Sequence, residues 1–262
     1  MVWQDRTIRL LGEDSVAKLN AARVCVFGLG AVGSYAVEAM ARAGIGNFLL
    51  VDFDTVKESN INRQLYALHS TLGQNKVELT RARILDINPE AVVDARGIFA
   101  HADTLPQLLR DKPDLIIDAV DSLTPKTEII AAGAERSIPV FSAMGAATRI
   151  DADKIHFARL FDAKGCPLAR LVRKRLRRRA VDESGDLWCV YSDELRNVAA
   201  IENPDEHDRQ VEEGEYDRGR VRGILGSLST ITGIFGLRLA HEAILRLAGS
   251  IATLEYTEGT EQ

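Results

Sequence analysis

The residues best suited to chemistry are two carboxylates, Asp52 and Asp54, and two cations, Arg63 and Lys76, which follow a glycine-rich loop. A glycine loop at the start of a helix binds phosphate through free main-chain N–H groups and the positive end of the helix dipole. A dehydrogenase uses one acidic group for the adenine ribose and needs no Arg and Lys after its second strand. Two cations suit a triphosphate, whose charge must be neutralised before a nucleophile approaches phosphorus. The pattern therefore favours an ATP site over an NAD site.

A strand, a tight turn, a helix and a second strand must position these groups. The apolar run 24–27 predicts the first strand, residues 34–43 have helical spacing, and the run 48–51 leads directly into Asp52. Between them lies the loop Gly28-Leu-Gly30-Ala-Val-Gly33, and the acidic residue follows about 20 positions later, as in dinucleotide-binding units. The glycines allow the tight turn, the close approach of a phosphate and the packing of the helix on the strand.

The chain then alternates between strand and helix patterns. Further strands are expected over 91–95, 114–121, 139–143 and 154–159, and further helices over 72–85, 101–109 and 124–135. A short helical arm over 5–19 precedes the first strand. This alternation predicts an α/β, Rossmann-like fold, with a mostly parallel sheet and helices on both faces.

A C-terminal extension follows the alternating part. It begins with a strongly basic helix over 166–180, continues through a highly charged segment at 201–222 and contains an uncharged run at 224–237. We expect the charged segment to be a mobile acidic crossing loop. The uncharged run is shorter than the roughly 20 residues that a bilayer crossing needs, which predicts a buried helix rather than membrane association. We therefore divide the chain into an N-terminal helical arm (1–22), an ATP-binding Rossmann-like domain (23–160) and an extension packed on the same core (161–262).

The composition is that of a globular protein without a disulfide or zinc framework. The chain has 262 residues, of which 46% are hydrophobic and 27% charged, with a formal net charge of −5, and this fits one large α/β core. Its three cysteines, Cys25, Cys166 and Cys189, form no CxxC pair. Cys25 lies in an apolar strand and is expected to pack there. The N-terminus is polar and has no signal-peptide pattern, so we expect a cytoplasmic protein.

Several motifs together resemble the ubiquitin-activating-enzyme-like adenylyltransferase superfamily, which includes the activators of sulfur-carrier proteins. These motifs are the three glycines, Asp52-x-Asp54, Asn60-x-x-Arg63-Gln64, Lys76 and Asp118-x-x-Asp121. A finer set is similar to the tRNA threonylcarbamoyladenosine dehydratase branch: Arg6-x-x-Arg9-Leu-x-Gly12, Gly44-Ile-Gly46, Cys189-Val-Tyr-Ser-x-Glu194 and the basic helix from Pro167. The lack of CxxC pairs supports this branch, because sulfur-carrier activators commonly hold zinc with two such pairs. Ala31 departs from the pattern, since these loops often carry a second glycine there.

The resemblance implies an ATP- and Mg²⁺-dependent dehydration of threonylcarbamoyladenosine in tRNA. A carboxylate is a poor electrophile because its leaving group would be oxide. Attack on the α-phosphate of ATP releases pyrophosphate and gives an acyl-adenylate, from which AMP leaves when a nitrogen or oxygen of the same side chain closes a ring. The enzyme would mainly align groups and neutralise charge.

The same resemblance gives each motif a role. It assigns Gly28, Gly30 and Gly33 to the nucleotide, Asp52 to the ribose hydroxyls, Asn60, Arg63 and Lys76 to the phosphates with Gln64 beside them, and Asp121 to Mg²⁺. Arg9 resembles an arginine that enters the active site of a partner subunit, which implies a homodimer. Asp54 either contacts ATP or caps the following loop, and Asp118 fits a structural carboxylate better than a ligand.

Two features of the extension have competing interpretations. Arg173, Lys174, Arg177 and Arg178 are candidate contacts to the tRNA backbone, although a solvated face or pairing with the acidic segment would also explain them; no DNA partner is expected. Cys189 is either a packing residue or a thioester nucleophile, and ring closure within one substrate requires no enzyme thioester.

Three alternative functions share parts of this pattern. An adenylyltransferase acting on the C-terminal glycine of a ubiquitin-like sulfur carrier would use the same ATP site, and pyrophosphate exchange with each substrate would separate the two. An NAD-dependent oxidoreductase would need a catalytic acid or base, and none of the five histidines stands out. A non-catalytic partner in a sulfur relay would keep its role after Arg63 or Lys76 is replaced by Ala.

Overall fold

A seven-stranded sheet forms the centre of the molecule, in the order β3-β2-β1-β4-β5-β7-β6. The computed structural model describes residues 3–195 and 225–249. The strands are β1 (Arg23–Phe27), β2 (Asn47–Val51), β3 (Val92–Arg96), β4 (Leu115–Asp118), β5 (Val140–Ala143), β6 (Ile155–Arg159) and β7 (Leu187–Ser192). All neighbouring strands run parallel except β6, which pairs antiparallel with β7.

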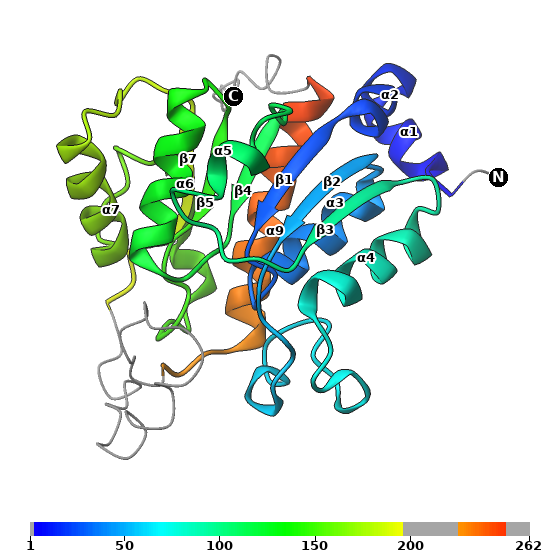
Figure 1. Cartoon of the computed structure of the whole chain (residues 1–262), viewed down its shortest axis with the longest axis horizontal. Helices are drawn as coiled ribbons and strands as arrows, with labels where there is room; N and C mark the ends of the chain where they lie inside the picture. The colour runs from blue at the N-terminus through cyan, green and yellow to red at the C-terminus, as the bar shows by residue number, and fades with distance from the viewer. Residues whose placement is uncertain (1–2, 196–224, 250–262) are drawn as a thin grey trace, which may run out of the picture.

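Helices cover both faces of this sheet (Figure 1). One face carries α3 (Gly33–Ala43), α4 (Lys76–Ile87) and α9 (Ser229–Ala248), and the other carries α5 (Leu105–Leu108), α6 (Leu123–Glu135) and α7 (Pro167–Arg178). Alternation along β1 shows the two layers, because Val24 and Val26 pack against α3 and α9 while Cys25 and Phe27 face α6 and α7. The predicted mostly parallel sheet with helices on both faces is thus confirmed, and Cys25 packs in the core as expected.

Glycines with positive φ explain two differences from the expected helices. The N-terminal arm is two helices, α1 (Asp5–Leu11) and α2 (Glu13–Ala21), because Gly12 between them has a φ of 85°. Helix α4 begins at Lys76 rather than at residue 72, because Gly73 has a φ of 78°. Short 3₁₀ turns lie nearby, η1 (Glu58–Asn60) and η2 (His69–Thr71), and a third, η3 (Ala152–Lys154), precedes β6. Left-handed backbone such as that at Gly12 and Gly73 interrupts or ends a helix.

Two further elements differ from the sequence prediction. The expected helix over 101–109 is only α5 (Leu105–Leu108), because the Thr104 hydroxyl accepts from the His101 N–H and so closes a turn before it. Strand β7 was not predicted, and it lies between β5 and β6. Its run Leu-Trp-Cys-Val-Tyr-Ser is largely buried and shows no polar alternation, as expected for an interior strand, which here pairs parallel with β5 and antiparallel with β6.

The last helix packs tightly on the helix that follows the glycine loop. In α9, a Cβ at Gly236 would overlap the main-chain oxygen of Val32, and one at Gly233 would lie 3.4 Å from the Tyr35 ring. The uncharged C-terminal run therefore contributes to a buried core helix, as predicted. Among the described helices, none is both long and apolar enough to cross a membrane. The predicted acidic crossing loop at 201–222 lies outside the described residues, and the proposed domain boundaries stay a prediction.

Candidate nucleotide site

The carboxyl ends of β1, β2 and β4 meet at one edge of the sheet. Phe27 at the end of β1 pairs with Val51 on one side and with Asp118 on the other. The Gly28 N–H donates to the Val51 oxygen over 2.9 Å, and the Ala119 N–H donates to the Phe27 oxygen over 2.8 Å. The glycine loop, Asp52 and the turn after Asp118 therefore lie side by side. Ligands of open α/β sheets bind at such an edge.

The three loop glycines are required for different reasons. Gly28 has a φ of 87°, and a Cβ there would lie 2.9 Å from main-chain atoms of Ala119 and Val120. A Cβ at Gly33 would overlap the Gly28 oxygen, so the protein's own packing excludes side chains at both positions. Gly30 differs, because the nearest atom to its Cβ position is the Gln64 amide nitrogen at 3.6 Å. Only a flexible side chain lies over Gly30, so packing of the backbone does not exclude a phosphate from approaching there.

Asp52 is tied to the glycine loop by its side chain. One carboxylate oxygen accepts from the Leu29 N–H over 2.7 Å, and the other accepts from the Asp54 N–H over 2.9 Å. Burial raises the pKa of the Asp52 carboxyl, and the charge of Lys76 and the two N–H donors offset this rise only in part. The carboxylate thus lies where a hydroxyl of a bound ribose would reach it.

Lys76 and Asp54 form an ion pair beside the loop. The Lys76 ammonium lies 2.7 Å from an Asp54 carboxylate oxygen, with 8% of the lysine side chain exposed and 43% of the aspartate side chain exposed. The Lys76 N–H also donates to the Asp54 main-chain oxygen over 3.1 Å. Asp54 therefore holds both the main chain and the side-chain ammonium of Lys76, the first residue of α4.

The segment with Asn60, Arg63 and Gln64 lies next to the glycine loop. The Asn60 side-chain oxygen accepts from the Lys57 N–H over 3.1 Å and so closes the η1 turn. The Arg63 guanidinium donates to the Ser59 main-chain oxygen and the Asn62 side-chain oxygen, each over 2.7 Å. Of these side chains, Gln64 is the one whose contact with the loop is direct, because its amide lies over Gly30.

A buried ion pair holds the turn that carries Asp121. One Asp118 carboxylate oxygen accepts from the Lys126 ammonium over 2.7 Å and from the Ser142 hydroxyl over 2.6 Å, and the other accepts from the Val120 N–H over 3.2 Å. Burial raises the pKa of Asp118, against the charge and hydrogen bonds of Lys126. Asp118 is therefore structural, as expected. Sequence reasoning missed Lys126, because its neighbours Thr124, Thr127 and Glu128 make the first turns of α6 polar in sequence.

Asp121 lies exposed just before α6, where the Ser122 hydroxyl is 3.4 Å from its carboxylate. The described residues contain no group of three or more His, Cys, Asp or Glu side chains that could hold a metal ion. A single carboxylate beside a phosphate loop fits Mg²⁺ that takes its other ligands from phosphate oxygens and water. The donor set thus suits a cation that arrives with a nucleotide.

Two predicted site residues lie elsewhere. Arg9 is exposed on α1, and this helix lies toward the amino edge of the sheet, away from the carboxyl end of β1 (Figure 1). Cys189 lies within β7, fully buried, opposite Ser142 of β5. Burial raises the pKa of the Cys189 thiol to about 12, so the neutral thiol predominates at physiological pH. Its surroundings are those of a packing residue.

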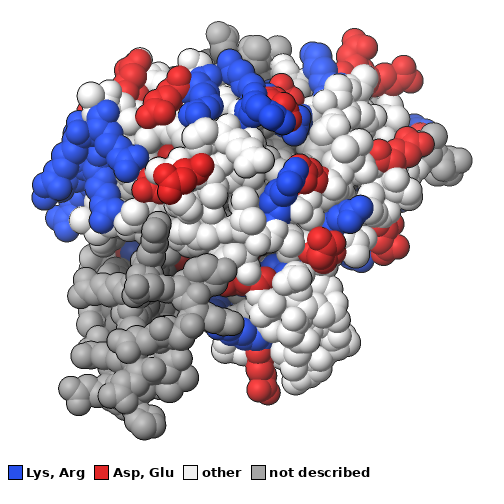
Figure 2. All heavy atoms as spheres, in the orientation of Figure 1, with Lys and Arg blue, Asp and Glu red and all other residues white. Residues whose placement is uncertain are grey.

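Lysine and arginine side chains gather over α7 (Figure 2), but they differ in their contacts. Arg173 donates to the main-chain oxygens of Leu160 and Ala163, and Arg177 donates to both carboxylate oxygens of Glu183. Lys174 and Arg178 are exposed and make no polar side-chain contact with the described residues, and Arg170 shares this property. These last three are spaced four residues apart and form one line along the helix. Arg170 was missed by the sequence prediction.

Comparisons with known proteins agree with the motifs. The ThiF family model matches residues 4–260. The tRNA threonylcarbamoyladenosine dehydratase of Bacillus subtilis (strain 168) is 40% identical over 184 residues, which are 70% of this chain and 72% of that protein. Its counterpart from Escherichia coli (strain K12) is 33% identical over 258 residues, 95% of this chain and 96% of the relative.

A solved structure and a second group of relatives are also similar to this chain. The crystal structure of the E. coli tRNA N6-threonylcarbamoyladenosine dehydratase in complex with ATP matches with a TM-score of 0.79 at 30% identity and covers 94% of both chains. The molybdopterin-synthase adenylyltransferase of E. coli (strain K12) is 34% identical over a shorter stretch of 153 residues, 58% of this chain and 60% of that protein. These similarities confirm the resemblance drawn from the motifs. The chain belongs to the ThiF family.

Proposed function

We propose that this protein catalyses the ATP-dependent dehydration of threonylcarbamoyladenosine in tRNA to its cyclic form. Similarity to dehydratases along 95% of the chain supports the substrate. The observation that supports the chemistry is the edge of the sheet where the glycine loop, Asp52 and the turn after Asp118 lie side by side, with Lys76 paired to Asp54. Phosphate-binding backbone, a ribose acceptor, a cation and a metal-binding carboxylate are the groups that adenylation needs.

The reaction follows from these groups. The threonyl carboxylate attacks the α-phosphorus of ATP, and pyrophosphate leaves, neutralised by Lys76 and Arg63, with Asn60 and Gln64 as further hydrogen-bonding groups. Asp121 would hold Mg²⁺, which would supply further positive charge to neutralise the phosphates. A nitrogen or oxygen of the same threonylcarbamoyl group then attacks the activated carbonyl carbon and loses its proton, and AMP leaves with the former carboxylate oxygen. The nucleoside has lost one water overall.

Mass spectrometry of nucleosides tests this proposal. tRNA containing threonylcarbamoyladenosine is incubated with the protein, ATP and Mg²⁺, and the nucleosides are analysed after mild digestion. The expected result is a nucleoside lighter by one water, formed only with ATP and lost in Lys76→Ala. An unchanged nucleoside in the presence of a correctly folded, ATP-binding protein would reject the assignment.

A second candidate is adenylation of the C-terminal glycine of a ubiquitin-like sulfur carrier. The similarity to molybdopterin-synthase adenylyltransferase over 153 residues favours it, and a protein partner in a sulfur relay would follow from it. ATP–pyrophosphate exchange that depends on the carrier rather than on tRNA would identify this activity. A purely docking role in a sulfur relay would instead survive Lys76→Ala.

The position of Arg9 supports a homodimer as the working unit. Arg9 lies near the amino edge of its own sheet, where its guanidinium is 3.7 Å from the Asp5 carboxylate, so we expect it to reach the nucleotide site of a second copy. Mixing Arg9→Ala with Lys76→Ala tests this, because a mixed dimer keeps one site that carries both Arg9 and Lys76. We expect partial recovery of activity in the mixture, whereas two silent variants that stay silent together would contradict it.

We further propose that the line of Arg170, Lys174 and Arg178 contacts the tRNA backbone. The exposed and solvent-facing charges on α7 are better placed for phosphates than Arg173, whose guanidinium is held by main-chain oxygens. Reversing the three charges to Glu should weaken tRNA binding. It should also make the affinity less dependent on salt, reducing the magnitude of the slope of log affinity against log salt concentration by about two to three. Arg81→Glu with Arg110→Glu is the matched control. Unchanged tRNA affinity would remove this surface from the model.

A further inference from the structure

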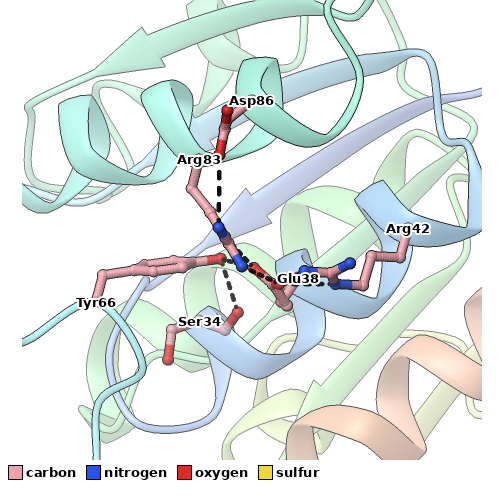
Figure 3. A network of polar contacts seen from close by, with 6 residues as sticks. All are labelled: Ser34, Glu38, Arg42, Tyr66, Arg83 and Asp86. Atoms are coloured by element: carbon pink, nitrogen blue, oxygen red, sulfur yellow. Dashed lines mark hydrogen bonds and ion pairs between the residues drawn. The ribbon is translucent and has the colours of Figure 1, made fainter.

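A cluster of polar side chains joins the three segments that carry the predicted phosphate ligands (Figure 3). Ser34 and Glu38 lie on α3, which begins at the last loop glycine, and Tyr66 comes two residues after Gln64. Arg83 lies on α4, whose first residue is Lys76. The glycine loop, the Arg63 segment and the Lys76 helix are thus connected at one point, on the side of α3 that faces away from α9.

Ser34 holds the Arg63 segment directly. Its hydroxyl oxygen accepts from the Leu65 N–H over 3.2 Å, and its main-chain oxygen accepts from the Tyr66 hydroxyl over 3.1 Å. The Tyr66 hydroxyl is also 3.4 Å from the Glu38 carboxylate, and its single proton is shared between these two acceptors. Three hydrogen bonds therefore fix the backbone just after Gln64 against the first turn of α3.

Glu38 connects this point to α4. The Arg83 guanidinium donates to both carboxylate oxygens of Glu38, over 3.0 and 2.9 Å, and Arg42 donates to one of them over 2.8 Å. Only 15% of the Glu38 side chain is exposed. A two-point guanidinium–carboxylate contact restricts both distance and orientation, which a single lysine contact would not.

Burial would raise the pKa of Glu38, but the hydrogen bonds from Arg83 and Arg42 outweigh it and lower the pKa overall. The carboxylate is therefore charged across the neutral range. Tyr66 remains a neutral donor, since burial and the Glu38 charge raise its pKa. The cluster keeps one arrangement of charges under physiological conditions.

We infer that Tyr66 is a positioning residue that, together with Glu38 and Arg83, holds the Arg63–Gln64 segment over the glycine loop before ATP binds. The inference rests on the proposed adenylation site. Arg63 and Lys76 belong to different segments of the chain, so a site built from both needs an internal connection that keeps them in place. Groups that are already aligned lose less freedom when the nucleotide arrives.

The test is removal of one hydroxyl. Tyr66→Phe keeps the ring and deletes the hydrogen bonds, and Tyr35→Phe is the matched control, because Tyr35 lies on α3 but its hydroxyl makes no hydrogen bond with the described residues. We expect Tyr66→Phe to weaken ATP binding, measured by calorimetry, by about three- to tenfold, with Tyr35→Phe unchanged. The KM for ATP should rise by the same factor while kcat changes less.

A double-mutant cycle separates positioning from general stability. If Tyr66 acts through Arg63, Tyr66→Phe should have little further effect on ATP affinity in an Arg63→Ala background. Additive effects, or an equal loss in Tyr35→Phe, would overturn the inference. Should Tyr66→Phe lower the unfolding midpoint, Ser34→Ala replaces it in the same cycle, because it deletes the hydroxyl that accepts from the Leu65 N–H. ATP binding is measured without tRNA, so a failure of the proposed tRNA reaction would be seen separately.

Discussion

The Lys76 ammonium lies 2.7 Å from the Asp54 carboxylate, and the lysine is nearly buried while the aspartate is half exposed. In the nucleotide-free protein, Asp54 therefore supplies the negative charge that a triphosphate would supply in the complex. A lysine held in this way is desolvated and positioned before its substrate binds.

Asp54→Asn should destabilise the ATP-free protein by about 1–2 kcal/mol, because it leaves a nearly buried ammonium without its carboxylate and the exposed side of the pair limits the loss. Saturating ATP should reduce the difference in unfolding free energy between Asp54→Asn and the wild type, because phosphate replaces the missing negative charge. Urea unfolding with and without ATP measures both quantities. An equal gap in the two conditions would show that the nucleotide does not meet Lys76.

The loop glycines should separate folding from binding. Gly33→Ala places a methyl group against the Gly28 oxygen and should prevent normal folding, whereas Gly30→Ala meets only the Gln64 amide at 3.6 Å. We expect Gly30→Ala to keep the circular dichroism spectrum and unfolding midpoint of the wild type but to lose ATP affinity at least tenfold. Normal ATP binding by Gly30→Ala would mean that the phosphates lie away from this glycine.

The buried Asp118–Lys126 pair predicts a non-additive stability pattern. Lys126→Met alone should cost about 3–5 kcal/mol of unfolding free energy, because it leaves a buried carboxylate unpaired. Adding Asp118→Asn removes that charge and should recover part of the loss. Denaturant unfolding of the two single variants and the double variant gives the coupling energy. A double variant as unstable as the sum of the singles would contradict the pairing.

Cys189 should be dispensable for catalysis. Its thiol is fully buried with a pKa raised to about 12, so neither access nor ionisation favours a thioester. Cys189→Ala should retain at least half of the wild-type kcat for tRNA dehydration, and the native protein should resist alkylation of Cys189 by iodoacetamide at pH 8 until it is unfolded. Loss of adenylation-dependent product in a stable Cys189→Ala variant would restore the nucleophile interpretation.

Glu38 should contribute a component of acid sensitivity. Its pKa in the folded protein is lowered from the ordinary value of 4.5, so the folded state favours the charged carboxylate. This stabilisation is fully present above the unfolded-state pKa and is lost as the pH falls through the lower folded-state pKa. Unfolding free energies measured at neutral pH and at progressively lower pH below 4.5 should therefore converge for the wild type and Glu38→Gln. A constant difference over this range would exclude Glu38 as the source.

The part of the candidate site that follows from the sequence is the part whose residues lie close together in one short segment. The loop from Gly28 to Gly33 and Asp52 belong to a single βαβ unit whose geometry follows from spacing. Lys126 could not be placed in this way, because its partners Asp118 and Ser142 come from β4 and β5 and meet it only after the sheet forms.

Helix phase explains why the cations predicted from the sequence on α7 differ in their contacts. The buried residues Ala169, Val172 and Leu176 define the inner face of that helix, and Arg173 borders it, so its guanidinium reaches main-chain oxygens of the core. Arg170 is on the outer side. The number of cations indicated a basic helix, but it did not distinguish the side that faces the core from the outer side.

The close fit of Gly236 against Val32 has a consequence for how the protein is made. The helix that completes the glycine loop is covered by α9, which is synthesised almost 200 residues later, between Ser229 and Ala248. During translation, the apolar side of α3 therefore stays exposed until α9 has left the ribosome. Contacts of such long sequence separation form slowly. A chaperone that covers the apolar side of α3 in the nascent chain would therefore raise the yield of folded, nucleotide-binding protein. It would leave the unfolding free energy of the folded protein unchanged.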